Sequence, residues 1–332
     1  MEKAILLKTQ LAEAAGFAKS KRFGHKRLAV ILLDNFIEIQ LSSLMRQKFE
    51  WNIYLKGNIY SHDKKAKILN HFDELLKASL EEEIITPNEK MLLAFCHKIR
   101  NNLYHKGDEE KLLTQVAIII LYDIIKKYQP NWRTSRMFTT FHFDAVDPYK
   151  IETENTFISG GNSEGDWKKF LEKYFVIIDK RNKTASRLIS DFLITKIRDA
   201  KDAYKFIQTE FDIFFPYAKD WTFNDFILQY SFAKIKESQL EKIKEISDPN
   251  ERKKEIIKLQ EEYLKGWRVK KPERLSTLEK SFKELSKLPI EKSIEKFTTY
   301  RDETYLFHDT LSNAASDLDG AIQNAIDIAR GK

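Results

Sequence analysis

Glycine and proline, the residues that most often interrupt helices, are scarce in this sequence. Ten glycines and seven prolines among 332 residues make up about 5% of the chain, whereas the two together make up about 12% of an average protein. Because 42% of the residues are hydrophobic, the chain can bury a core and is not a disordered protein. The sequence therefore predicts an all-α fold built from long helices.

Three of the ten glycines lie within eight residues of one another, in the stretch SGGNSEGD at residues 159–166. Stretches of this composition are typical of linkers. Helical periodicity is absent throughout residues 131–166, where a short alternation at residues 137–143 fits either a strand or an extended loop. We therefore expect a helical bundle over residues 1–130, an irregular connector over 131–166 and a second helical domain over 167–332.

Hydrophobic spacing and capping signals locate the helices of the predicted bundle. Hydrophobic residues recur three and four apart over residues 27–50 and 62–84, as on the buried face of a helix. Thr86-Pro87-Asn88-Glu89 is a capping box with proline at the first helical position, which predicts a third helix from residue 87 to about residue 106. Helices over 3–18 and 108–127 bring the predicted bundle to four or five members. Beyond the connector, helices are predicted over residues 167–215, 222–246, 250–266, 273–286 and 289–329.

Charge and cysteine content restrict the partners and the compartment. The formal net charge is +7, which suits a polyanionic partner. A single cysteine, Cys96, excludes a disulfide within the chain and a cysteine-rich zinc site, so we expect a reducing, cytoplasmic environment. The apolar run at residues 116–122 is too short to span a bilayer and no secretory signal is recognised, so no membrane partner is expected. Histidine spacings match no metal motif, and neither a metal nor a cofactor is expected.

One predicted helix carries most of the chemically useful side chains. Residues 97–107 read HKIRNNLYHKG. At about 100° per residue, the apolar residues of this helix, Cys96 among them, occupy one arc that faces a core. The remaining surface, where Leu93 is the one apolar residue, presents the following polar groups: Arg100, Tyr104, His97, Asn101 and His105.

These side chains suit the cleavage of a phosphodiester. Arginine binds phosphate oxygens bidentately and stays protonated, so it can offset charge that develops on phosphorus. Histidine can accept or donate a proton near neutral pH. Because one histidine cannot easily perform both roles, we expect a two-fold dimer to bring the same helix face from two subunits together.

Arg100 and Asn101, followed by His105, resemble the R-x4-H signature of the HEPN superfamily. The helix RLAVILLDNFIEIQL is also similar to the N-terminal bundle helix of many HEPN proteins, and the resemblance covers about residues 20–130. It implies a dimeric helical bundle and a metal-independent endoribonuclease that leaves a 2′,3′-cyclic phosphate and a 5′-hydroxyl. It also implies a role in antiviral defence, as in abortive infection, or in a toxin system.

The resemblance assigns roles to several residues by position. Arg100 and His105 correspond to the catalytic pair, and Asn101 to an orienting residue. Asp34 or Glu38, on the first long helix, corresponds to the acidic group that some members place near the site. Two more side chains of the motif helix, Tyr104 and His97, are supporting candidates. The tyrosine that some members carry two positions after the histidine is replaced here by Gly107.

Two basic stretches are candidates for binding RNA phosphates. We expect the second domain to sense a trigger or to bind a regulatory or antitoxin protein, and the protein to form a homodimer or a higher homo-oligomer. The candidate RNA-binding residues are Lys21, Arg22, Lys26 and Arg27 in the first stretch, and Trp267, Arg268, Lys270 and Lys271 in the second.

Other interpretations remain open. The fold could be a noncatalytic HEPN-like scaffold that binds RNA or a nucleotide, or that serves only to dimerise. It could also be an all-helical interaction protein whose lysine- and glutamate-rich C-terminal helices form the functional surface. In both cases Arg100 and His105 would only oppose the dipole at the end of their helix, and Asp34 and Glu38 would be solvated or form salt bridges.

Overall fold

The computed structural model describes residues 2–56, 59–105, 110–127, 149, 169–174, 184–214, 243–265 and 272–331. All regular secondary structure within these ranges is helical, which confirms the predicted all-α class. The chain divides into two units, Met1–Leu188 and Ile189–Lys332, and each is described by itself. Among residues 131–166, where a connector was predicted, only Tyr149 is described.

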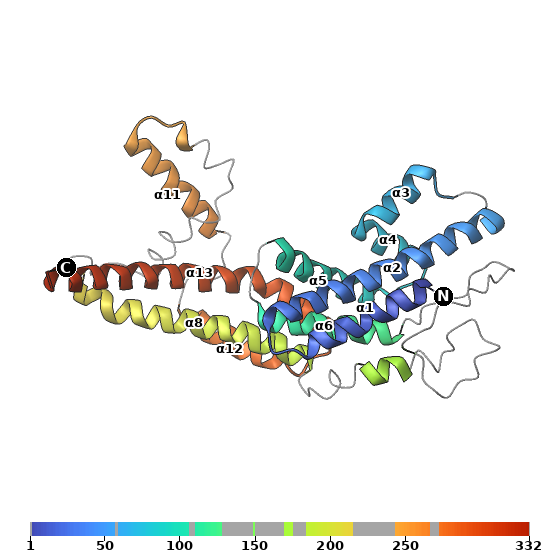
Figure 1. The fold of residues 1–332 in the computed structure, drawn as a ribbon. Coiled ribbons are helices and arrows are strands. Elements are labelled where there is room, and N and C mark those ends of the chain that lie inside the picture. The colour runs from blue at the N-terminus through green and yellow to red at the C-terminus, as the bar shows by residue number, and fades with distance from the viewer. Residues whose placement is uncertain are drawn as a thin grey trace. The chain divides into compact units, whose positions relative to one another are not determined.

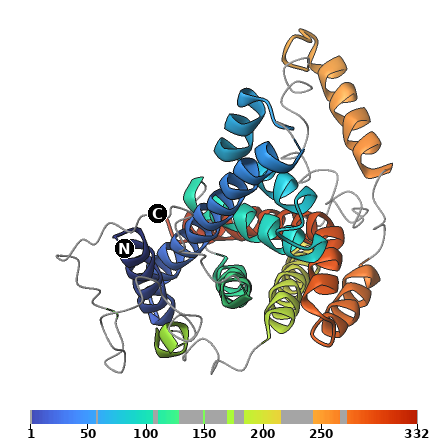
Figure 2. The same ribbon diagram turned by 90° about the vertical axis from the view of Figure 1, so that its right-hand side faces the viewer.

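The first unit is organised around one long helix. Helix α2 contacts α1, α4, α5 and α6, and α1 lies beside it in the opposite direction (Figures 1 and 2). The inward face of α2 carries Val30, Leu33, Phe36 and Ile37, all buried, and each such side chain contributes about 1.5–3 kcal/mol when fully buried. The helices of this unit are α1 (Glu2–Lys19), α2 (Phe23–Lys56), α3 (His62–Asn70), α4 (Phe72–Glu81), α5 (Pro87–His105) and α6 (Lys111–Lys127).

The prediction of a single helix over residues 62–84 is wrong, because two helices occupy this range. Helix α3 ends and α4 begins at His71, whose backbone is extended with φ −125° and ψ 117°. Ser61 caps α3 by accepting a hydrogen bond from the Lys64 amide at 3.2 Å. Neither glycine nor proline marks the break, and the hydrophobic spacing continues from Ile68 to Phe72 as it would in one helix.

The capping box predicted at the start of α5 is confirmed. The Thr86 amide donates to Oε2 of Glu89 at 2.9 Å, and the Glu89 amide donates to Oγ1 of Thr86 at 3.2 Å. Two of the amides that no helical carbonyl can reach are thereby satisfied. Pro87 then occupies the first helical position, as expected.

The second unit is held together by three helices, α8 (Ala185–Phe214), α12 (Glu273–Leu285) and α13 (Ile290–Ala329), which lie side by side in both views (Figures 1 and 2). Ser190 on α8 donates to the Phe282 carbonyl on α12 at 2.7 Å. Glu279 on α12 binds Lys201 at 2.7 Å and Arg198 at 3.2 Å, both on α8. The first turn of α8 lies at the boundary between the two units.

The helices predicted in the second half are found where the structure describes them, except that the prediction of one continuous helix over 167–215 is wrong: Thr184 is not helical, and its Oγ1 accepts from the Arg187 amide at 3.2 Å at the start of α8. Residues 169–174 and α8 fall within the predicted helix 167–215, but residues 175–183 are not described. Helix α11 (Pro249–Lys265) matches the helix predicted over 250–266. The helix predicted over 222–246 lies almost wholly outside the described residues.

The segment Phe23–Asn52 of α2 is long and apolar enough to cross a membrane when judged by length and composition alone. Half of it is buried inside the fold. A core helix of a soluble protein meets the same criterion, so this segment does not show a membrane protein.

Candidate active site

Helix α5 places its side chains against three neighbouring helices. Cys96 packs toward α6, where its thiol lies 3.9 Å from the Ala117 carbonyl. His97 packs toward α4 and α2 through contacts with Phe72 and Asp34. Leu93, expected on the exposed polar face, is instead fully buried. Helices α2 and α4 both contact α5, so the first half of this polar face lies against the bundle.

Asp34 is the centre of a buried polar cluster. Its side chain is 1% exposed, and its Oδ2 lies 2.8 Å from Nδ1 of His97. The imidazole also stacks on Phe72, with ring centroids 4.0 Å apart. A carboxylate that accepts from Nδ1–H fixes the orientation of the imidazole ring, and Nε2 is then the ring nitrogen that Asp34 does not contact. Asp34, His97 and Phe72 thus join α2, α5 and α4 at one point.

Arg100 lies at the outer edge of this cluster. Its Nε is 3.9 Å from Oδ2 of Asp34, and its Nη1 donates to Oδ1 of Asn101 at 2.9 Å. The guanidinium carbon lies 5.7 Å from the ring centroid of Tyr104, a distance compatible with a cation–π contact. Nε of Arg100 and Oδ1 of Asp34 are buried without a hydrogen-bond partner among the described residues. Such atoms are costly, because folding removes their water without replacing it.

Exposure increases steadily along this face of α5. The side chain of His97 is 18% exposed and that of Arg100 is 29% exposed, while Tyr104 is 63% exposed. The charged groups therefore start in the interior and reach solvent at the end of the helix. A phosphate that approached this end would meet Arg100 without having to enter the core.

His105 is the last residue of α5, and its side chain lies outside the described residues. Its backbone is helical, so position 105 lies about 7–8 Å along the helix axis from position 100 and about 140° around it. The R-x4-H pair thus lies in the last two turns of α5. Gly107 and the Asp108 cap predicted for the next helix also lie outside the described residues.

Glu38 does not join the cluster around Asp34. It lies one turn further along α2, half-buried, in a hollow of about 260 Å³ that Ser42, Ser43 and Arg46 also line. No hydrogen bond or ion pair joins Glu38 to α5 within the described residues. Of the two acidic candidates, the fold brings only Asp34 to the R-x4-H helix.

The first basic stretch lies beside the end of α5. Nη2 of Arg27 donates to the backbone carbonyl of Leu103, one of the last carbonyls of the helix. Those carbonyls have no partner within their own helix, so an arginine is well suited to cap them. Lys21 and Arg22 are exposed in the turn before α2, and Lys26 is half-buried. The second stretch, with Trp267, Arg268, Lys270 and Lys271, lies outside the described residues.

Neither Cys96 nor a metal provides an alternative centre in the described part of the chain. Burial and the nearby charge of Asp34 raise the pKa of the Cys96 thiol well above its usual range, so the thiolate that would act as a nucleophile is disfavoured. No group of three histidine, cysteine or acidic side chains that could hold a metal ion occurs among the described residues.

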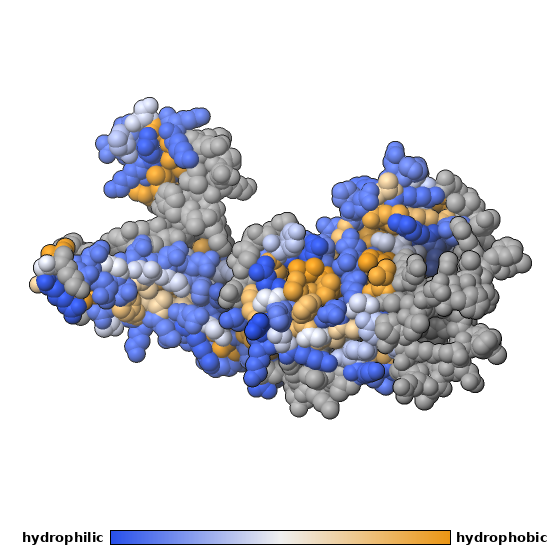
Figure 3. Space-filling model, viewed as in Figure 1, coloured by the Kyte–Doolittle hydropathy of each residue, from blue (hydrophilic) through white to orange (hydrophobic). Residues whose placement is uncertain are grey.

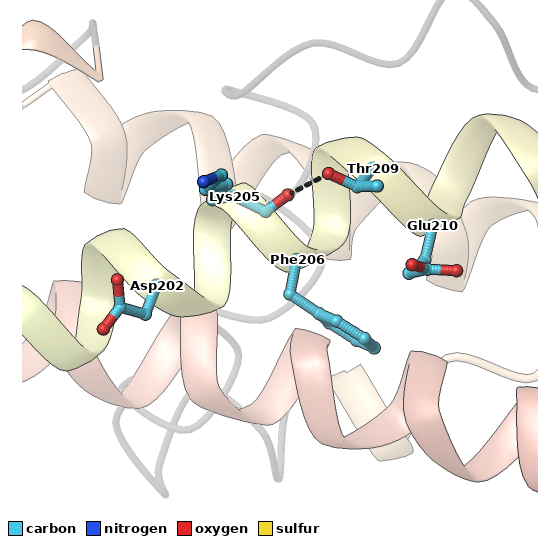
Figure 4. A pocket seen from close by; sticks show the side chains of 5 residues that line it. All are labelled: Asp202, Lys205, Phe206, Thr209 and Glu210. Carbon is cyan, nitrogen blue, oxygen red and sulfur yellow. Dashed lines mark hydrogen bonds between the residues drawn. The ribbon is translucent and has the colours of Figure 1, made fainter.

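A second hollow, of about 300 Å³, lies on α8 in the other unit. Figure 4 shows Phe206 extending away from Lys205, while Oγ1 of Thr209 donates to the Lys205 backbone carbonyl at 3.0 Å. Asp202 and Glu210 complete its lining. All the lining residues come from one helix, so this hollow is an open stretch of surface without converging polar groups.

No protein-family model matches the chain, and no curated protein or solved structure matches it either. The side chains of α5 and their surroundings are therefore the features that indicate a function.

Proposed function

We propose that the protein is a metal-independent endoribonuclease of the HEPN type, with Arg100 and His105 as its catalytic residues. The observation that carries the proposal is the position of Arg100, whose Nε lies 3.9 Å from Oδ2 of the buried Asp34. A buried anion of this kind holds a guanidinium in place before the substrate arrives. The resemblance of Arg100, Asn101 and His105 to the R-x4-H signature supplies the reaction class.

The proposed reaction is transesterification of RNA. The 2′-oxygen attacks the adjacent phosphorus, the bond from phosphorus to the 5′-oxygen breaks, and the products are a 2′,3′-cyclic phosphate and a 5′-hydroxyl. His105 of one subunit accepts the proton from the 2′-hydroxyl, and the same residue of a second subunit donates a proton to the leaving 5′-oxygen. Arg100 binds the non-bridging oxygens and offsets the charge that develops on them.

Three further residues have supporting roles in this proposal. Asn101 accepts a hydrogen bond from Arg100 and so restricts the guanidinium to one direction. His97 and Asp34 are positioning residues, because their mutual hydrogen bond keeps the carboxylate oriented toward Arg100. The second unit is proposed to sense a trigger or to bind a regulatory or antitoxin partner, in a cytoplasmic role in antiviral defence or a toxin system.

Cleavage of labelled RNA by the purified protein in EDTA tests the proposal. Wild type is expected to produce fragments that end in a cyclic phosphate, and both Arg100→Ala and His105→Ala are expected to lower the rate by about 10²-fold or more. Lys98→Ala is the matched control, because Lys98 is an exposed cation on the same helix. Cleavage that survives both substitutions would exclude the site, and a strict monomer in light scattering would exclude a shared one.

A noncatalytic scaffold is the second candidate, and one observation favours it. Arg100 contacts Asp34, Asn101 and Tyr104, all within the same subunit, which is what a purely structural arginine would do. In that case Arg100→Ala lowers the melting temperature, no RNA is cut under any condition, and the α5 face binds RNA or a nucleotide or completes a dimer.

The third candidate is an interaction protein that works through α11. Figure 3 shows this helix as mostly hydrophilic with a hydrophobic strip along it. Ile257 of this helix is 41% exposed, and Lys253 and Lys254 are also exposed. Loss of a protein partner on Ile257→Glu, with RNA cleavage absent, would favour this candidate over the nuclease.

A further inference from the structure

Tyr104 is an aromatic side chain that the fold leaves accessible. It is 63% exposed, although it lies one helical turn beyond the half-buried Arg100 on the same face of α5. The guanidinium of Arg100, at 5.7 Å from the ring centroid, supports the ring from the protein side. An aromatic ring held in this way loses little conformational freedom when a second flat group stacks on it.

A basic turn is tied to the same end of α5. The hydrogen bond from Arg27 to the Leu103 carbonyl joins the start of α2 to α5, at the residue directly before Tyr104. The Arg22 carbonyl accepts from the Lys26 amide at 3.4 Å, and the Arg22 amide donates to Oγ of Ser20 at 3.1 Å. Arg22 therefore directly precedes α2, which starts at Phe23, and lies about 7–8 Å along the axis from Arg27.

We propose that Tyr104 and this basic turn form one binding tract for single-stranded RNA. An unpaired base stacks on the ring of Tyr104, and the phosphates that follow it contact Lys21 and Arg22, which are exposed. Stacking on an aromatic ring and backbone contacts to cations are the two elements of sequence-tolerant single-strand binding. The choice of RNA as the ligand rests on the proposed ribonuclease function. The tract adds that the RNA is single-stranded, because a duplex would hide the base that stacks on Tyr104.

The tract also predicts where the substrate enters. Arg100 lies between Tyr104 and the buried cluster, so a base on Tyr104 would place its own phosphate close to the guanidinium. The stacked nucleotide then lies next to the bond that is cut. Sequence preference in this tract is expected to be weak, because every base has a flat face that can stack.

Binding of a short, fluorescein-labelled 2′-O-methyl oligonucleotide, followed by anisotropy, tests the tract separately from cleavage. This probe lacks the 2′-hydroxyl nucleophile and stays intact whether or not the protein is a nuclease. Tyr104→Ala is expected to weaken binding about tenfold, while Tyr104→Phe retains it, because phenylalanine can still stack. Trp51→Ala is the matched control, since Trp51 is also an aromatic residue with 63% exposure, further along α2.

The basic turn is tested through the dependence of binding on salt. If Lys21 and Arg22 each contact one phosphate, replacing both with alanine makes the negative slope of log K against log salt shallower by about 1.4. The control removes two exposed lysines of α11, Lys253 and Lys254, and is expected to leave the slope unchanged. The net charge then falls equally in both variants.

The proposed tract is overturned if Tyr104→Ala binds as wild type does, if Tyr104→Phe loses as much binding as Tyr104→Ala, or if a duplex of the same sequence binds equally well. Absence of any binding would overturn it too. If the oligonucleotide binds as predicted while natural RNA is never cleaved, the tract stands and the proposed nuclease fails. If RNA is cleaved but Tyr104→Ala binds normally, the nuclease stands and the tract fails.

Discussion

The carboxylate of Asp34 and the imidazole of His97 meet at 2.8 Å, although 63 residues separate them in the chain. Because Asp34 is also 3.9 Å from Nε of Arg100, one buried anion faces two groups that can carry positive charge. Helix α5 is thereby fixed to α2 through the side chains that the proposed function uses. Stability and substrate binding are therefore expected to respond together when Asp34 is changed.

Replacing Asp34 with alanine should destabilise the first unit strongly. Removing one partner of a buried charged pair leaves the other without compensation, and here the expected loss of unfolding free energy is about 3 kcal/mol. The measurement is the midpoint of urea unfolding. Glu38→Ala is the control on the same helix; Glu38 is half-buried and unconnected to α5, so it should change stability by no more than about 0.5 kcal/mol. Equal effects of the two substitutions would contradict the role given to Asp34.

The local signals of the sequence identified α5 well. Thr86, Pro87 and Glu89 lie within four residues, and their capping geometry depends on the local backbone alone, so the helix start could be predicted. The polar groups of α5 could be identified by the same means, since their order on a helical wheel depends only on their spacing. The burial of Leu93 could not be predicted, because a helical wheel carries no information about which neighbouring helices pack against α5.

The contacts that build the candidate site depend on distant parts of the chain. Asp34 and Glu38 are both acidic and lie four positions apart on one face of α2. Nothing in the sequence distinguishes the buried carboxylate from the half-exposed one. The bond from Arg27 to the Leu103 carbonyl joins residues 76 positions apart. His71 breaks a helix with no glycine or proline to signal it. Each of these features is decided by tertiary packing, which a single sequence read locally does not contain.

Alkaline pH should destabilise the first unit through Tyr60. Its hydroxyl donates to Oε1 of Glu82 at 2.7 Å, and burial together with that carboxylate raises the pKa of Tyr60 to about 12, against about 10 in the unfolded chain. Below pH 10 both states keep the proton, so the full contribution is present. Between pH 10 and 12 only the unfolded state loses it, and stability falls by about 1.4 kcal/mol per pH unit.

Urea midpoints measured from about pH 8 to pH 11 test this dependence. Near neutral pH, Tyr60→Phe is expected to lower the free energy of unfolding by about 1 kcal/mol, because the variant lacks the hydrogen bond to Glu82. Above pH 10 the variant should show a flatter decline than wild type, because it has no hydroxyl to titrate at this position. Parallel curves for the two proteins would contradict the assigned cause.

Acid should weaken the second unit through Glu279. Hydrogen bonds from Lys201, with Lys283 and Arg198 also nearby, hold the pKa of this carboxyl at about 2. The stabilising contribution is present above the ordinary value near 4.5 and is lost as the pH falls toward 2, by about 1–2 kcal/mol at pH 3.

Glu279→Gln should remove this acid sensitivity, because glutamine does not titrate. The control is Glu284→Gln on the same helix, whose partner Lys287 lies at 2.8 Å in a pair that is largely exposed and contributes little. Thermal unfolding between about pH 6 and pH 3 makes the comparison. An acid response that persists in Glu279→Gln would show that other carboxylates dominate it.

Cys96 offers a direct measure of how often the first unit opens. The thiol is fully buried and its pKa is raised by that burial and by Asp34, so a thiol reagent such as DTNB should react with it only after local or global unfolding. As the chain has no other cysteine, the observed rate belongs to this site alone.

Asp34→Ala, with about 3 kcal/mol less stability, is expected to accelerate labelling about 100-fold if opening is global. Lys98→Cys adds an exposed thiol on the same helix and should label rapidly in the folded protein, which calibrates the reagent. Rapid labelling of wild-type Cys96 would contradict its place between α5 and α6.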